Sequence, residues 1–203
     1  RRETFERVNR GGTESVVIAC RASGIRRLIA VSALGARQDA ASPFLRSKWQ
    51  AEEVVRRSGL SWTVVRPAPM FGPGDRLSST LARALRRLPV FPVFGSGAYV
   101  LQPVAVAEVA AALLVALETG AGAGETVEMG GPEVLTYLEV VRRTAAAIGL
   151  RRSLVHLPPG ASRAAVDALR WLPEPPLTPD QLAVLMAGSQ CGTRPAAAFP
   201  PPP

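Results

Sequence analysis

Ser32, Lys48 and Pro67 are the residues whose types and positions best suit a ligand-binding site. Ser32 ends a short apolar run, 27–32, and Pro67 follows a second β-rich run, 61–66. Both runs are typical of strands in a parallel sheet. Because ligands of open parallel sheets lie outside the carboxyl ends of the strands, we expect Ser32 and Pro67 at one shared binding edge.

The helix expected between these strands carries Lys48, which is the only lysine in the chain. Ser42-Pro43 predicts the start of this helix, because serine caps helices and proline is favoured at the first helical position. Phe44 and Lys48 are one helical turn apart and therefore face the same way. A simple ion pair with Glu52, four residues further on, is the alternative role for Lys48.

Helices alternate with strands along the rest of the chain, which predicts an α/β fold. The expected helices span residues 4–22, 43–58, 77–88, 106–117, 136–148, 162–172 and 179–187, and the expected strands span 27–32, 61–66, 125–129 and 153–157. Residues 90–97 are expected to be irregular because they contain proline. Gly11 and Gly12 interrupt the first helix, which suggests close packing there.

The composition excludes several classes of protein. Cys20, Cys191 and the single His156 are too few for a structural zinc site, and they suggest no disulfide framework, so no metal is expected. We expect Cys20 in the core and His156 in a structural role. The longest strongly apolar stretch, 104–117, contains Glu108 and is too short to span a bilayer. The net charge of +8 comes mainly from arginines spread along the sequence without interleaved aromatic residues, so no nucleic-acid partner is expected.

Six stretches of the sequence form an ordered set: VNRGGT (8–13), IAVSALGA (29–36), SPFLRSKWQAE (42–52), WTVVRPAPMFGPGD (62–75), QPVAVAEVA (102–110) and GGPEVLTYLE (130–139). Together they resemble the extended and atypical short-chain dehydrogenase/reductase family of NAD(P)-binding proteins. Within this family, the similarity is greatest to the branch that contains the accessory NAD(P)H-binding subunit of respiratory complex I. The resemblance implies the C-terminal part of a Rossmann-type, doubly wound parallel sheet, with a small helical elaboration on the substrate side.

The resemblance also implies roles for individual residues. The family's active site combines a serine with the motif Tyr-x-x-x-Lys, and Ser32 and Lys48 match the serine and the lysine. Phe44 stands where the tyrosine is expected, and a phenyl ring has no proton to exchange with a substrate. The resemblance therefore implies cofactor binding more strongly than catalysis. The residues expected to contact the cofactor are Ser32, Ala33, Lys48, Pro67, Ala68, Pro69 and Met70.

The family opens with a strand and a glycine-rich turn that cradles the pyrophosphate, and neither precedes residue 3 here. We therefore expect a truncated sequence, with a partial NAD(P)-binding domain over residues 1–130, an elaboration over 131–190 and a disordered proline-rich tail over 191–203. Such a chain is expected to bind NAD or NADP weakly or not at all.

The function implied by the resemblance is that of an NAD(P)-binding protein without hydride-transfer activity, in a structural, redox-sensing or respiratory, quinone-related role. Two alternatives stay open. One is an active nucleotide-sugar epimerase, dehydratase or reductase with a displaced acid, and the other is a redox-sensing interaction module. The expected partners are the dinucleotide and either another protein or a second copy of the chain. The expected location is the cytoplasm, and peripheral association with the inner face of the membrane is compatible with it.

Overall fold

The computed structural model describes residues 4–169 and 177–192 of the chain. Its largest sheet is parallel, with the order β1-β2-β7, and consists of β1 (Arg27–Val31), β2 (Ser61–Pro67) and β7 (Glu125–Met129). Val31 lies opposite Val65, and Pro67 lies opposite Met129. The carboxyl ends of the three strands therefore meet at one edge, as the sequence predicts.

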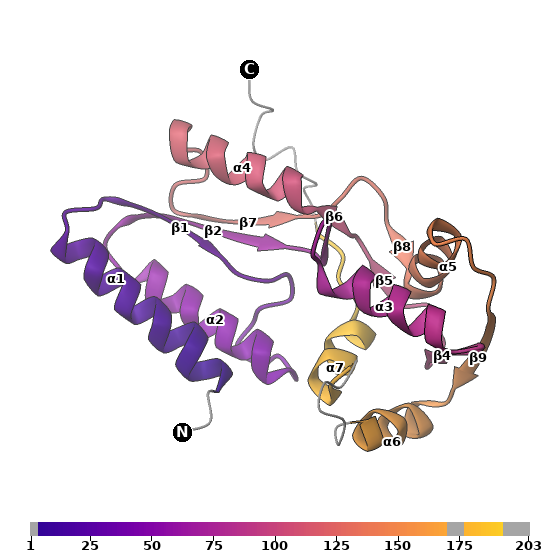
Figure 1. Cartoon of the computed structure of the whole chain (residues 1–203). Coiled ribbons are helices and arrows are strands. Elements are labelled where there is room, and N and C mark those ends of the chain that lie inside the picture. Colours follow the sequence, from indigo (N-terminus) through magenta and orange to yellow (C-terminus); the bar gives the residue numbers. More distant parts are fainter. Residues whose placement is uncertain (1–3, 170–176, 193–203) are drawn as a thin grey trace.

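Helices cover both faces of this sheet, as Figure 1 shows. Helices α1 (Gly12–Ala22) and α2 (Pro43–Arg56) lie on one face, and α4 (Val106–Thr119) lies on the other. The apolar residues of α4 pack with those of β2 and β7 in one buried cluster. Burial is most complete in the central strand β2, where the consecutive residues Thr63, Val64 and Val65 are all buried, as expected for a parallel strand covered on both faces.

The first helix contains a turn of π-helix. Residues Arg7–Gly11 (η1) are π-helical and lead without interruption into α1. A Cβ atom at Gly11 or Gly12 would meet no atom of the described residues within 4 Å, so the close packing expected there is wrong. The two glycines instead mark the place where the helix changes its hydrogen-bonding pattern. Such turns are frequent at functional sites.

A second lobe is built around a two-stranded parallel sheet. Strand β4 (Val90–Phe94) pairs with β9 (Ser153–Leu157), so residues 90–94 are a strand rather than the irregular segment expected. Proline is tolerated here because both strands of a pair are edge strands, where a missing N–H group costs no inner ladder bond. Only the tertiary pairing with residues 63 positions away reveals this strand.

Four helices enclose this pair of strands. Helices α3 (Arg76–Arg87) and α5 (Tyr137–Ala147) form one buried cluster with β4, and α6 (Pro159–Leu169) and α7 (Pro179–Ala187) form a smaller one around Phe94. The second lobe thus includes residues from well before 130, and the domain boundary expected at residue 130 stays a prediction. The end of the helix expected over 162–172 lies outside the described residues.

Short strand pairs connect the two lobes. Strand β3 (Met70–Phe71) pairs with β6 (Val104–Ala105), and β5 (Val100–Leu101) pairs with β8 (Leu135–Thr136). The chain approaches itself so closely here that a Cβ atom at Gly131 would overlap the carbonyl oxygen of Pro103. Of the expected tail, residues 193–203 lie outside the described part. In the described part, no helix is long and apolar enough to cross a membrane.

The outer edge of β1 generates the first testable prediction. β1 has one strand neighbour among the described residues, β2, and Val31 is 42% exposed. Because an apolar unpaired strand edge is a template for association, we expect residues 1–203 to form dimers or larger species in sedimentation velocity. Val31→Lys should shift the distribution toward monomer. Ile18→Lys on α1, where Ile18 is 67% exposed, should not. A monomeric parent chain, or dissociation by the Ile18 variant alone, would contradict this prediction.

Candidate functional site

Ser32 lies directly after β1, where the chain leaves the sheet. Its backbone N–H donates to the carbonyl oxygen of Val65, 2.7 Å away, so it still follows the register of β1 and β2. Leu34 N–H likewise donates to the Pro67 oxygen at 3.0 Å, which confirms that Ser32 and Pro67 share one edge. The Ser32 hydroxyl is buried and has no hydrogen-bond partner among the described residues. Since buried polar groups are rarely unpaired, this hydroxyl indicates a place for a ligand atom or water.

Lys48 extends from α2 toward the same edge. Its Nζ donates to the Val31 carbonyl oxygen at 3.1 Å, one residue before Ser32. Burial lowers the pKa of the Lys48 ammonium group, and the nearby Glu52 carboxylate opposes this effect. Lys48 and Ser32 line a shared hollow between the first two helices and β1, together with Asn9, Thr13, Ala30, Val31, Ala51, Glu52 and Val55.

The sequence analysis missed the buried cluster that Glu52 forms with two arginines. This carboxylate is 1% exposed and accepts two hydrogen bonds from Arg66, at 2.8 and 2.7 Å, and one from Arg56 at 2.7 Å. Arg56 also donates to Thr126 Oγ1, so the cluster joins α2 to both β2 and β7. The simple Lys48–Glu52 ion pair is therefore not what forms. In the described part of the chain, Glu52 pairs with the two arginines and Lys48 turns to the strand.

Phe44 packs one helical turn before Lys48. Its ring meets the ring of Phe5 edge-on, with the centroids 5.6 Å apart. Asn9, in the π-helical turn, donates from Nδ2 to Ser47 Oγ at 2.9 Å, and Ser47 Oγ in turn donates to the Phe44 carbonyl oxygen. The first helix thus packs against the helical turn between Phe44 and Lys48 and supports it. The two glycines after Asn9 were the only sequence signal for the π-helical turn that makes this contact.

The segment after β2 is occupied by contacts within the protein. Ala68 N–H donates to the Met129 oxygen at 2.7 Å, and Pro69 accepts from Val104 N–H at 3.1 Å. Pro67 already accepts from Leu34. The exposed part of this segment is therefore mainly Met70, whose side chain is 37% exposed. Contacts of Ala33, Pro67, Ala68, Pro69 and Met70 with a cofactor stay predictions.

The other candidate residues lie elsewhere. Cys20 is buried in α1, as expected. His156 is exposed on β9 in the second lobe, away from the Ser32 edge. The chain's two tyrosines, Tyr99 and Tyr137, stack on each other in that lobe with ring centroids 5.8 Å apart. Among the described residues, no group of three His, Cys, Asp or Glu side chains could hold a metal ion.

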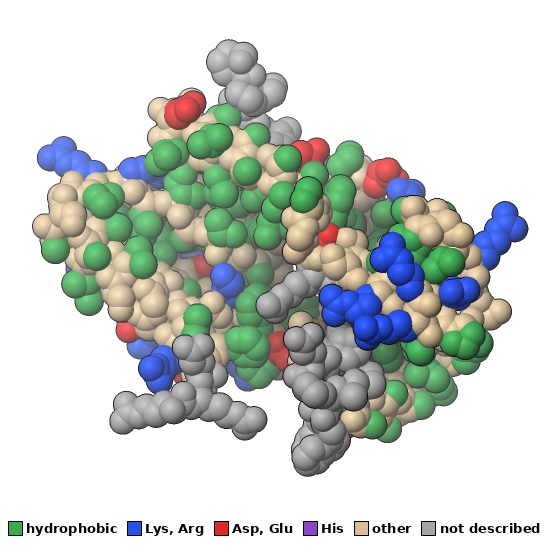
Figure 2. Space-filling model, in the orientation of Figure 1, with side chains coloured by type: hydrophobic (Ala, Val, Ile, Leu, Met, Phe, Trp, Pro, Cys, Tyr) green, Lys and Arg blue, Asp and Glu red, His purple; other side chains and the backbone are tan. Residues whose placement is uncertain are grey.

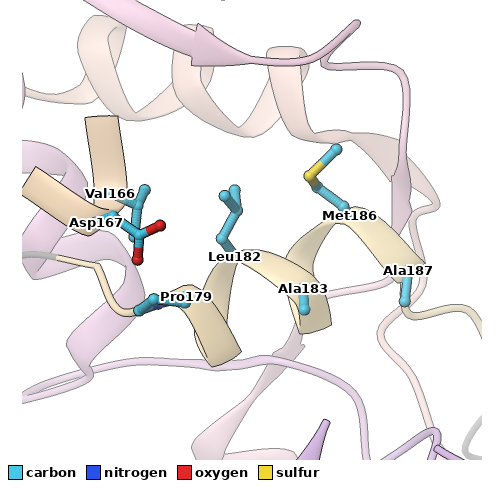
Figure 3. Close-up of a pocket in the computed structure, with 7 residues that line it drawn as sticks. All are labelled: Val166, Asp167, Pro179, Leu182, Ala183, Met186 and Ala187. Atoms are coloured by element: carbon cyan, nitrogen blue, oxygen red, sulfur yellow. The ribbon is translucent and has the colours of Figure 1, made fainter. Parts of the chain in front are cut away.

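A second, larger hollow lies between α6 and α7, as Figure 3 shows. Its lining is mostly apolar, with the carboxylate of Asp167 as the one charged group among the residues that line it. Those residues are Val166, Asp167, Pro179, Leu182, Ala183, Met186 and Ala187. None of them was singled out from the sequence, because their convergence depends on how two separate helices pack.

Comparison with known proteins places these features in a family context. The model of the NAD(P)H-binding family matches residues 2–89, which include Ser32 and Lys48. The chain is 37% identical over 139 residues to the Arabidopsis thaliana mitochondrial NADH dehydrogenase [ubiquinone] 1 alpha subcomplex subunit 9, covering 68% of this chain and 35% of that protein. It is 33% identical over 177 residues to the ceramide reductase of Caulobacter vibrioides, covering 86% of this chain and 55% of the reductase. The chain thus spans between about a third and about half of these relatives.

Solved structures agree on the fold. The UDP-glucose 4-epimerase of Thermotoga maritima superposes with a TM-score of 0.66 at 24% identity, over 89% of this chain and 68% of the epimerase. A dTDP-glucose 4,6-dehydratase of Streptomyces venezuelae with bound NAD superposes with a TM-score of 0.64 at 21% identity, over 77% of this chain and 58% of the dehydratase. The expected Rossmann-like α/β fold is confirmed.

The buried Glu52 cluster generates a stability prediction. Glu52→Gln keeps the side-chain shape but leaves Arg66, which is 18% exposed, without its counter-charge and leaves Arg56 with Glu53 alone. The loss of this buried carboxylate should cost about 3–5 kcal/mol of unfolding free energy. Glu53→Gln is the matched control. Glu53 is more exposed and pairs with Arg56 and Arg57 at the surface, so its loss should cost less than about 1 kcal/mol. Urea unfolding followed by circular dichroism measures both, and equal losses would show that Glu52 is not structurally special.

Proposed function

Because this chain belongs to the short-chain dehydrogenase/reductase-like family of NAD(P)-binding proteins, near its complex I subunit branch, we propose that it holds the nicotinamide end of NAD(P)(H) without efficient hydride transfer. Its role is then structural or redox-sensing, in a respiratory or quinone-related assembly in the cytoplasm or at the inner face of a membrane. The observation that carries this proposal is the buried, unpartnered hydroxyl of Ser32 beside the half-buried ammonium group of Lys48.

The residues at this edge fit the nicotinamide ribose. Lys48 Nζ has three N–H donors and uses one on Val31, so two remain for ribose hydroxyls. Ser32 Oγ can donate to a carbonyl or hydroxyl oxygen brought to the same edge. When bound, the cofactor supplies or accepts a hydride at its nicotinamide ring. Lys48 and Ser32 would orient that ring, and the π-helical turn at Asn9 would support the helix that carries Lys48.

Proton transfer is the step that this arrangement lacks. Phe44 has only a phenyl ring at the position one turn before Lys48, and that ring packs against Phe5. Neither tyrosine can replace it locally, because Tyr99 and Tyr137 stack in the other lobe, and burial raises the pKa of Tyr137. No tyrosine lines the hollow of Ser32 and Lys48. A general acid must reach to about 3 Å from the substrate oxygen, so hydride transfer by this chain should be slow.

A reductase is the second candidate function. The alignment with ceramide reductase covers 86% of this chain, and the apolar hollow between α6 and α7 is a place where an apolar part of a substrate could lie. This candidate requires a proton donor other than a residue at position 44. A nucleotide-sugar epimerase or dehydratase has the support of fold similarity alone.

Binding of the nicotinamide end alone can be tested with the two halves of the cofactor, the nicotinamide mononucleotide and AMP. We expect reduced nicotinamide mononucleotide to bind residues 1–203 with a dissociation constant of about 1 mM, and AMP to bind more weakly, because Ser32 and Lys48 contact only the nicotinamide end. Lys48→Ala should weaken the mononucleotide at least about tenfold, the loss of one charge-assisted hydrogen bond. Gln50→Ala, on the same helix, should leave it unchanged. NMR titration measures all four affinities. Tighter binding of AMP than of the mononucleotide, or binding of whole NADPH in the micromolar range, would contradict the proposal that this chain holds only the nicotinamide end.

Catalysis can be tested by restoring the missing hydroxyl. With NADPH in large excess and phenanthrenequinone as hydride acceptor, the parent chain should show very slow single-turnover oxidation. Phe44→Tyr should raise the rate by about tenfold or more, because positioned acid catalysis typically contributes 10² to 10⁴. Phe5→Tyr adds the same hydroxyl to the ring that contacts Phe44, and should change nothing. Fast turnover by the parent that survives Lys48→Ala would overturn the non-catalytic proposal in favour of the reductase.

A further inference from the structure

The positive charge of the chain is concentrated in the second lobe. Residues 76–104 and 133–157 contain eight arginines, two glutamates and no aspartate. These two segments, separated in the sequence, supply most of the net charge of +8. The even spread of arginines along the sequence therefore does not carry over to three dimensions. The fold brings them together, because α3 packs against α5 and β4 pairs with β9.

The densest part of this charge lies on α3. Arg83, Arg86 and Arg87 are all exposed and lie three and four residues apart, so they share one helix face. Arg152 Nε donates to the Leu85 carbonyl oxygen at 2.8 Å, which brings the exposed Arg151 to the same end of α3. Figure 2 shows blue side chains gathered over α3. We call the four residues Arg83, Arg86, Arg87 and Arg151 the basic surface.

These arginines have no acidic partners in the described part of the chain. The salt bridges found there involve none of the four. Among the arginines of this lobe whose side chains the structure describes, Arg143 alone has a salt bridge, with Glu133. Elsewhere in the chain, several arginines pair with an acid one helical turn away, such as Arg10 with Glu14 and Arg57 with Glu53. An unmatched group of cations produces a local positive potential that attracts an anionic surface.

Exposed aliphatic side chains border the basic surface. Leu88 directly follows α3 and is 40% exposed, and Val90 on β4 is 44% exposed. Val90 pairs with Ser153, which directly follows Arg151 and Arg152 in the sequence. Leu88 and Val90 thus lie at the end of the lobe that carries Arg87 and Arg151.

We propose that the basic surface, with Leu88 and Val90 beside it, docks the second lobe on a bilayer that contains anionic lipid. Arginines would bind headgroup phosphates while the short aliphatic side chains reach the boundary with the acyl chains. A flat anionic layer fits better than an acidic protein, because neither described hollow lies at α3 to select a shaped partner. It fits better than nucleic acid, because the aromatic residues nearby, Phe91 and Tyr137, are buried and cannot stack on bases. This docking rests on the membrane location in the proposed function, to which it gives a surface, and it does not depend on nucleotide binding.

Vesicle binding tests the proposal on residues 1–203. Vesicles of phosphatidylcholine with about one third phosphatidylserine should sediment the chain, and vesicles of phosphatidylcholine alone should not. Each basic residue near such a surface contributes about fivefold to partitioning, so Arg83→Gln, Arg86→Gln and Arg87→Gln combined should weaken binding about 100-fold. The control combines Arg7→Gln, Arg26→Gln and Arg57→Gln, which remove the same charge from the first lobe. It should weaken binding only a fewfold.

A second variant separates docking from simple charge attraction. Leu88→Ser with Val90→Ser should weaken binding to the anionic vesicles several-fold while the net charge stays the same. Circular dichroism should show that the variants remain folded, because the substituted side chains are exposed and contribute little to the core. Equal losses in the two triple variants, or no loss in the serine variant, would overturn the proposal. So would tighter binding of a duplex DNA or of polyglutamate than of the vesicles, since a nucleic acid or an acidic protein would then be the better partner.

Discussion

The carboxylate of Glu52, held between Arg66 and Arg56, is the interaction on which the ligand edge depends. A charge that is almost wholly removed from water must be compensated, and here the compensating groups come from α2 itself and from β2. The bidentate bond from Arg66 fixes both the height and the rotation of α2 above the sheet. Lys48, one turn earlier on the same helix, is thereby directed to the carbonyl oxygen of Val31 at the end of β1.

Under the proposed function, this geometry would allow the site to bind the cofactor without a catalytic acid at position 44. Ser32 and Lys48 are positioned by the backbone register of the sheet and by the Glu52 cluster, and neither constraint involves the side chain at position 44. Phe44 instead makes an apolar contact with Phe5, which a hydroxyl would not improve. Replacement of a tyrosine by phenylalanine at this position is therefore structurally cheap, whereas its chemical consequence is large.

The two lobes divide the chemistry of the chain between them. The first lobe carries the parallel sheet, the candidate nucleotide edge and several arginines that pair with acids. The second lobe carries an excess of unmatched arginines and an apolar hollow between α6 and α7. Short strand pairs and the close approach of Gly131 to Pro103 join the lobes. An anionic surface bound by one lobe and a nucleotide held by the other would thus act on a single connected framework.

Local patterns in the sequence were sufficient for much of this architecture. A short apolar run predicted β1 and a β-rich run predicted β2. The capping residues Ser42 and Thr136 predicted where α2 and α5 begin, because these signals depend only on neighbouring residues. The common edge of Ser32 and Pro67 followed from the geometry of parallel strands. The resemblance to the family's Tyr-x-x-x-Lys motif, with Phe44 in the place of the tyrosine, led to the hypothesis that the usual proton donor is missing.

Tertiary structure alone decided the remaining features, because each depends on residues that are distant in the sequence. Glu52 could be assigned to Arg66 rather than Lys48 only after β2 was placed beneath α2. Residues 90–94 became a strand because β9, which follows 63 residues later in the sequence, provides their hydrogen-bond partners. The arginines, evenly spread in the sequence, became one basic surface when α3 and the segment around Arg152 packed together. Pairing, burial and surface potential are properties of the folded arrangement, and a linear pattern does not contain them.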